Sequence, residues 1–152
     1  MYPKYEEDFY GWAIKSAELL RNRQFSDLDI DHLSEEIESM GRSEKKELSN
    51  FLITLLEHLL KLRCADHGAK ERNKTKWEST VKRQRDNIKT SLQENPSLKS
   101  DFNNDFLARA FKNAVLGVKE SYGLYEDINL DLIPQKCPYT VEQCLDEEFY
   151  PE

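Results

Sequence analysis

The feature that most constrains the fold is an apolar stripe that recurs every three or four residues across residues 30–62. Its members are Ile30, Leu33, Ile37, Met40, Leu48, Phe51, Leu52, Leu55, Leu56, Leu59 and Leu62. Residues at this spacing share one face of an α-helix, so the stripe predicts a long amphipathic helix that buries that face. Gly41 lies within the stripe, and the sequence leaves open whether the helix is kinked or continuous there.

Similar spacing predicts three further helices, over about residues 5–23, 74–94 and 97–122. Asp27 or Asp29 can cap the long helix, Gly68 can end it, and Ser97 can cap the last one. Thr140 and Gln143 form a capping-box pattern for one short helix near the C-terminus. No segment alternates apolar and polar residues for long enough to form a sheet. We therefore predict an all-α fold, a compact four-helix bundle-like domain with a short C-terminal helix and an acidic tail.

Length and composition favour one folded domain over residues 1–152. The chain has 152 residues, enough for a sizeable core, and its aromatic content of 11% is atypical of disordered chains. No apolar run reaches the roughly 18 residues that cross a bilayer, and the N-terminus lacks the apolar segment of a secretory signal. The three cysteines form no CxxC pair. These features predict a cytoplasmic protein without membrane partners.

Charge is divided unevenly along the chain. Residues 70–89 carry eight basic and three acidic residues, a net charge of +5 in a chain of net charge −7. Residues 120–152 carry nine acidic residues and one basic residue. The basic segment offers four side chains to phosphates or to a protein partner: Lys74, Lys82, Arg83 and Lys89. Trp77 could stack on a base, but it is also in phase with Val81 and Ile88, which favours a core position. The charges would then be a solvated face or would complement the acidic tail.

Three polar residues lie beside apolar stripes and are the candidate catalytic set. Glu36 flanks the start of the long stripe, His58 flanks its second half, and Arg85 falls between Val81 and Ile88. If the helices pack as neighbours, the three side chains could form an acid/base or anion-binding pocket. They could equally form a polar network that fixes how the bundle packs.

Metal binding has two conceivable ligand sets. Cys64 and His67 are three residues apart and could be joined by Cys137 or Cys144, while His32, Glu36 and His58 could gather in a bundle core. Neither spacing matches an established signature, and His32 sits off the apolar face. The sequence also lacks a phosphate-binding glycine loop, a GxSxG and an HExxH motif. We therefore expect no metal site and no cofactor.

A set of short motifs along the chain resembles one bacterial family. They are Tyr5-Glu6-x-Asp8-Phe9-x-x-Trp12, Leu33-x-Glu35-Glu36-Ile37-Glu38 followed by Gly41-Arg42-Ser43, His58-Leu59-Leu60-Lys61, Trp77 with Arg85 and Ile88, Asn95-Pro96-Ser97-Leu98, Cys137-Pro138-Tyr139-Thr140 and Phe149-Tyr150-Pro151-Glu152. Together they resemble the domain of unknown function 29 family, which is abundant in cyanobacteria. The resemblance covers nearly the whole chain and implies a small all-helical bundle in a cytoplasmic protein. It implies no agreed activity, and it includes Glu36 and His58 among the family's recurring polar positions.

Three function hypotheses follow. The first is a noncatalytic interaction or regulatory module, antitoxin-like, that binds a protein partner through the basic segment or the acidic tail. The second is a small hydrolase or nuclease that uses Glu36 and His58, with Arg85 binding an anion. The third is nucleic-acid binding through residues 70–89, with affinity that falls steeply with salt. The sequence also leaves self-association into a homo-oligomer open.

Overall fold

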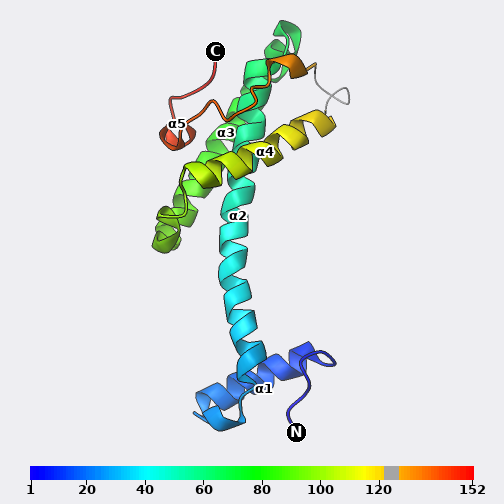
Figure 1. Cartoon of the computed structure of the whole chain (residues 1–152), viewed down its shortest axis with the longest axis vertical. Coiled ribbons are helices and arrows are strands. Elements are labelled where there is room, and N and C mark those ends of the chain that lie inside the picture. The colour runs from blue at the N-terminus through cyan, green and yellow to red at the C-terminus, as the bar shows by residue number, and fades with distance from the viewer. Residues whose placement is uncertain (122–126) are drawn as a thin grey trace. The chain divides into compact units, whose positions relative to one another are not determined.

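Helices account for nearly all the regular structure in the computed structural model, which describes residues 1–121 and 127–152 (Figure 1). In chain order the elements are α1 (Phe9–Arg21), the 3-10 helix η1 (Phe25–Asp27), α2 (Ile30–Cys64), α3 (His67–Glu94), the 3-10 helix η2 (Pro96–Lys99), α4 (Asn104–Ser121), the 3-10 helix η3 (Leu130–Leu132) and α5 (Val141–Leu145). Within the described ranges no β-strand forms, and one isolated antiparallel bridge pairs Ala65 with Ile128. The predicted all-α fold is confirmed.

The long apolar stripe forms a single helix, α2, which runs through Gly41. Asp29 caps its start, because the Asp29 carboxylate accepts the main-chain N–H of His32 at 3.4 Å. The predicted end of α2 at Gly68 is wrong. The helix stops at Cys64 rather than at Gly68, because Asp66 caps the next helix by accepting the N–H of Ala69 at 2.7 Å. Gly68 therefore lies in the first turn of α3, which begins at His67 and not near residue 74.

Two other helix starts also differ from prediction, each because a nearby side chain caps the helix later. α1 begins at Phe9 rather than near residue 5, since Asp8 accepts the N–H of Gly11 at 2.9 Å. Ser97 does not cap α4 as predicted, because it lies inside the 3-10 helix η2, whose N-cap is Asn95. α4 starts after Asn103, whose side chain accepts the N–H of Phe106 at 3.1 Å. The predicted end of this helix at residue 122, the start of the tail at residue 123 and the acidic Glu126 lie outside the described residues.

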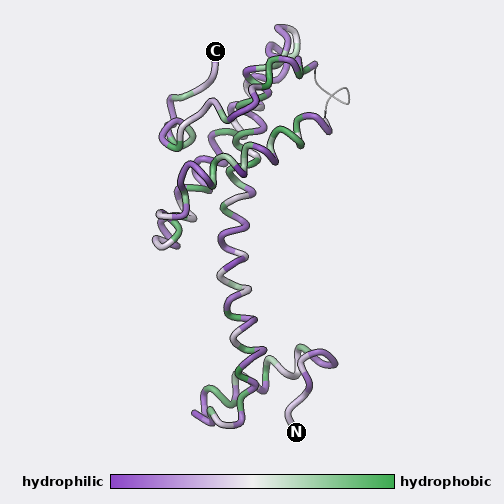
Figure 2. The backbone as a smooth tube through the Cα atoms, viewed as in Figure 1, coloured by the Kyte–Doolittle hydropathy of each residue, from purple (hydrophilic) through white to green (hydrophobic). Residues whose placement is uncertain are grey.

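The chain divides into two compact units, residues 1–44 and 45–152. In the first, α1 packs against the start of α2, and Trp12 and Leu19 are buried. The second contains the hydrophobic core, built from the rest of α2, from α3, α4 and the C-terminal segment. Figure 2 shows apolar residues recurring between polar ones along the helices. This division does not test whether residues 1–152 form one domain, so the single domain stays a prediction.

The C-terminal segment completes the core of the second unit. Tyr139 and Cys144 are buried in it, and the Tyr139 hydroxyl donates to the carbonyl oxygen of Leu59 at 3.4 Å. The predicted capping box at Thr140 and Gln143 forms at the start of α5, with both reciprocal hydrogen bonds present. The acidic tail is therefore anchored by its buried apolar side chains as well as by its charges.

Candidate functional site

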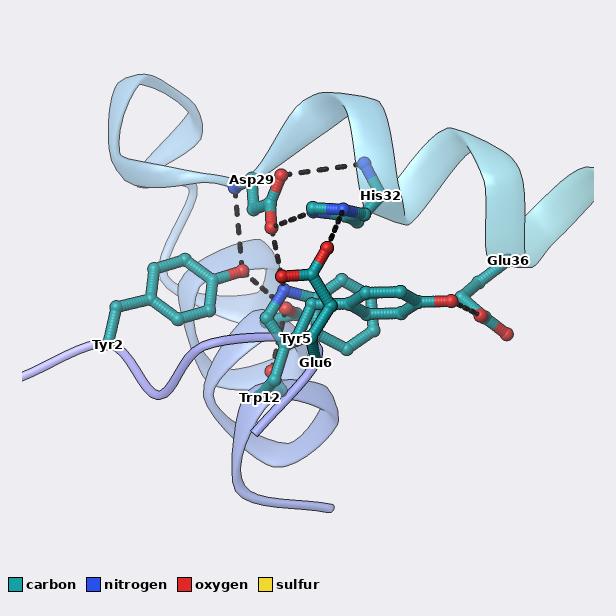
Figure 3. A network of polar contacts seen from close by, with 8 residues as sticks. Tyr2, Tyr5, Glu6, Trp12, Asp29, His32 and Glu36 are labelled. Atoms are coloured by element: carbon teal, nitrogen blue, oxygen red, sulfur yellow. Dashed lines mark hydrogen bonds and ion pairs between the residues drawn. The ribbon is translucent and has the colours of Figure 1, made fainter. Parts of the chain in front are cut away.

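A polar and aromatic cluster joins the two helical segments of the first unit (Figure 3). The Asp29 carboxylate lies 2.7 Å from Nδ1 of His32 and accepts the indole N–H of Trp12 at 3.0 Å. The hydrogen bond with His32 lowers the pKa of Asp29, and the same bond raises the pKa of His32. Asp29 thus combines a helix cap with an ion pair and holds α1 against α2 through Trp12.

Tyr5 extends this cluster to Glu36. Its ring stacks on His32, with centroids 4.2 Å apart and planes at 16°, and meets Trp12 edge-on at 4.9 Å. Its hydroxyl donates a hydrogen bond to the Glu36 carboxylate, and this bond is the main reason that the pKa of Tyr5 is raised. Glu36, a candidate catalytic acid or base, is therefore engaged with Tyr5 inside the first unit.

Beside this cluster the first unit has an apolar groove of about 260 Å³. Phe9, Trp12 and Leu20 line it from α1, and Ile37 and Met40 line it from α2. Four of these side chains are largely open to solvent: Phe9 52%, Leu20 41%, Ile37 59% and Met40 69% exposed. A contiguous group of exposed large apolar side chains is typical of an interaction surface.

Arg85 is buried in the second unit and is bound to the C-terminal segment. It is 0% exposed, and its Nε donates to the carbonyl oxygen of Cys144 at 2.9 Å. Its Nη2 donates to the carbonyl oxygens of Gln143 at 3.1 Å and Phe149 at 2.7 Å. Its guanidinium also lies 5.2 Å from the ring centroid of Tyr150, and burial lowers its pKa. These contacts make Arg85 the anchor of the tail.

His58 makes a local contact on α2, where its Nδ1 lies 2.8 Å from the carbonyl oxygen of Thr54. The three candidate catalytic residues are divided between the units, with Glu36 in the first and His58 and Arg85 in the second. Each has partners in its own unit, and a joint catalytic role stays a prediction. Among the described residues no group of three or more His, Cys, Asp or Glu side chains could hold a metal ion.

The basic segment becomes part of α3. Trp77 is 1% exposed, which confirms its predicted core position and leaves no ring face open for base stacking. Lys89 pairs with Glu147 of the acidic tail at 2.9 Å, and this contact lowers the pKa of Glu147. Lys74 lies 3.8 Å from Glu78, while Lys82 and Arg83 are exposed. Part of the positive charge therefore complements the tail, and phosphate or partner binding by these four basic residues stays a prediction.

A pocket of about 850 Å³ lies in the second unit. One wall is α4 and the other is residues 130–139, which we call the strap. Lys112, Lys119 and Lys136 line it together with many apolar side chains. None of the sequence patterns described above predicts this pocket. The available signal was the pair of lysines seven residues apart beside the apolar stripe of α4.

The short motifs quoted from the sequence resemble one family, and comparison with a model of that family tests the resemblance. The model described as domain of unknown function DUF29 matches residues 4–150. The chain belongs to the DUF29 family. No curated protein and no solved structure gives a significant match to this DUF29 chain. Among its described residues, none of the helices combines the length and the apolar character needed to cross a membrane.

Proposed function

We propose that this DUF29 chain is a noncatalytic interaction module whose first unit binds a basic amphipathic helix of a protein partner. The observation that carries the proposal is the groove between α1 and the start of α2. It combines four exposed large apolar side chains with the cluster of Tyr5, His32 and Asp29 beside it. A preformed apolar groove between helices is a common receptor for an amphipathic helix.

The first unit has little core of its own. Among its 44 residues only Trp12, Ser16 and Leu19 are buried. Domains of about 40 residues or fewer usually need a metal, a disulfide or association with another chain. Tyr10 and Ile14 are also exposed, so α1 carries apolar side chains on more than one face. A helix with apolar side chains on several faces is usually buried against other parts of a protein or against a partner.

The net charge of the first unit favours one kind of occupant for the groove, a basic helix. Residues 1–44 contain eleven acidic and five basic residues, a net charge of −6. Glu36 is itself one of the residues that line the groove. A basic helix is attracted to such a surface, whereas two copies of the unit repel one another. An antitoxin-like protein that sequesters a basic, nucleic-acid-directed partner would need a surface of this kind.

The geometry favours this surface over the two considered from the sequence. Arg85 and Lys89 of the basic segment contact the C-terminal segment, and Trp77 is in the core. The positive charges of Arg85 and Lys89 therefore already have partners within the chain. Four apolar side chains of the groove (Phe9, Leu20, Ile37 and Met40) stay exposed, and fully burying each is worth about 1.5–3 kcal/mol.

Two synthetic peptides with the same leucine face test the proposal, one with lysine and one with glutamate on the polar face. Fluorescence anisotropy should detect binding of the lysine peptide alone. Ile37→Lys should weaken it at least about tenfold, since it removes an apolar contact and adds a like charge. Ile30→Lys is the matched control, because Ile30 is 52% exposed on α2 but does not line the groove.

Three outcomes would contradict the proposal. One is equal binding of the glutamate peptide. Another is the same loss of affinity in Ile30→Lys as in Ile37→Lys. The third is a dimer in sedimentation that Ile37→Lys dissociates, because the occupant would then be a second copy of the chain.

A further inference from the structure

The pocket between α4 and the strap is independent of the groove in the first unit. Its floor is built from Leu107, Phe111 and Tyr139, which are all buried side chains of the core. Leu116 lies at its edge and is 53% exposed. The pocket therefore has a firm apolar floor and an open rim.

The rim is positively charged. Lys112 and Lys119 are seven residues apart on α4, which places them about 10.5 Å apart along one helix face. Lys136 faces the same space from the strap. No aspartate or glutamate among the described residues lines the pocket, although the chain as a whole has a net charge of −7. Among the described residues none of the three lysines lies within ion-pair distance of a carboxylate.

We propose that this pocket binds a small anionic amphiphile, a molecule with one apolar chain and a carboxylate or phosphate head. The apolar chain would lie on Phe111 and Tyr139, and the head would meet the lysines. The volume of about 850 Å³ lies within the 300–1,000 Å³ of typical small-molecule sites. Lysine is a point charge without the fork geometry of arginine, so the rim suits either head group.

The shape favours a small ligand over a docked helix. A helix is about 10–12 Å across and needs an open row of apolar positions. Here the floor is buried, and the strap, which includes Pro134, forms a second wall beside α4. An occupant that is narrower than a helix can reach Phe111 and Tyr139 between these walls.

Calorimetric titration with four amphiphiles of equal chain length tests the proposal. The ligands are dodecanoate, dodecyl phosphate, neutral dodecyl maltoside and cationic dodecyltrimethylammonium, each below its micelle concentration. We expect the two anions to bind at least about tenfold more tightly than the others. The ratio of the two anions identifies which head group the site prefers. Octanoate should bind at least about tenfold more weakly than dodecanoate, because it buries fewer methylenes in the apolar pocket.

Matched variants locate the site. Lys112→Gln and Lys119→Gln should each weaken dodecanoate binding several-fold, whereas Lys99→Gln, an exposed lysine on η2, should not. Leu116→Gln should weaken binding, while Leu132→Gln should leave it unchanged, because Leu132 is 52% exposed and lies outside the pocket. Bound dodecanoate should also slow labelling of Cys137, whose half-buried thiol lines the pocket.

The proposal is overturned by equal binding of the neutral or cationic amphiphile, or by absence of binding by both anions. It is also overturned if dodecanoate leaves Cys137 labelling unchanged, since the ligand would then lie elsewhere. A glutamate-leucine peptide that protects Cys137 while dodecanoate does not would make this surface a protein docking site instead. None of these results bears on the first unit, where the lysine-leucine peptide is tested separately.

Discussion

Arg85 donates from Nη2 to the carbonyl oxygen of Phe149 at 2.7 Å, a contact between residues 64 positions apart in the chain. The same guanidinium donates to the carbonyl oxygens of Gln143 and Cys144. One buried side chain near the middle of α3 therefore determines where the C-terminal segment lies. Its hydrogen-bond acceptors are main-chain carbonyl oxygens, and the Tyr150 side chain and the negative charge of Asp146 also favour the charged guanidinium.

Replacing this residue should destabilise the second unit. Arg85→Ala removes three hydrogen bonds and leaves the carbonyl oxygens of the tail without donors, at a cost of about 2–4 kcal/mol. Urea denaturation measures this loss. Arg85→Lys should recover only part of it, because an ammonium cannot reach all three carbonyls in the guanidinium geometry. Arg83→Ala is the control, since Arg83 is exposed, and a change within about 0.5 kcal/mol is expected. Equal losses at Arg83 and Arg85 would refute the anchoring role.

The first unit should lose stability as pH rises through neutrality. The pKa of His32 is raised by its hydrogen bond to Asp29, so its contribution is complete below the ordinary histidine value of about 6.5 and is lost as pH rises through the raised pKa. The pKa of Asp29 is lowered, so its contribution is present above about 3.9 and is lost as pH falls through the lowered pKa. Stability of this unit should therefore be greatest between about pH 4 and 6.5.

The indole N–H resonance of Trp12 reports this titration, because Trp12 donates to Asp29. The resonance should shift as pH rises above about 6.5, because the pKa of His32 lies above the ordinary histidine value, and the shift should vanish in His32→Gln. His67→Gln should leave it unchanged, since the His67 side chain is 88% exposed and pairs with Glu71. A persisting shift in His32→Gln would assign the titration to another group.

Glu36 should be coupled to Tyr5 in stability measurements. A double-mutant cycle with Tyr5→Phe and Glu36→Gln should be non-additive, because either single replacement already weakens the same hydrogen bond. Glu38 is the comparison, because its carboxylate forms only an exposed pair with Arg42 at 3.4 Å. Tyr5→Phe combined with Glu38→Gln should be additive. A coupling near zero for Tyr5 and Glu36 would show that the hydroxyl contact contributes nothing to folding.

The three thiols should differ in reactivity. Cys64 and Cys144 are buried, and burial raises the pKa of Cys144 to about 12. Cys137 is half-buried, and burial raises its pKa too. A higher pKa means less thiolate at neutral pH, so all three should react more slowly than a free thiol, with Cys137 first. Timed labelling followed by mass spectrometry measures the order. Faster labelling of Cys64 or Cys144 than of Cys137 would contradict the burial of these two thiols.

The sequence predicts the helices well where packing alone decides them. Trp77, Val81 and Ile88 are buried, as their helical phase indicates, because residues on one face of a helix meet the core together. Helix ends were less predictable, since Gly68 and Asp66 compete at the same turn. The aspartate cap at Asp66 sets the start of α3, and Gly68 is accommodated inside the helix.

The functional surfaces depend on long-range contacts that local patterns do not encode. Arg85 was recognisable as a polar residue beside an apolar stripe, but its partners lie 58 to 64 residues away on the main chain. His32 was considered as a metal ligand, whereas it pairs with Asp29 three residues earlier. The pocket beside α4 needs the strap as its second wall, and no spacing in the sequence predicts that strap.

The burial of Trp12 and Trp77 gives each unit its own intrinsic fluorophore. These are the two tryptophans of the chain, one in residues 1–44 and one in residues 45–152. Single replacements by phenylalanine would therefore let emission follow each unit separately during unfolding, without any label. Coincident transitions would identify one cooperative folding unit, and separate transitions would identify two. A long helix that contributes to both units would then be seen either to unfold as a whole or to fray from one end.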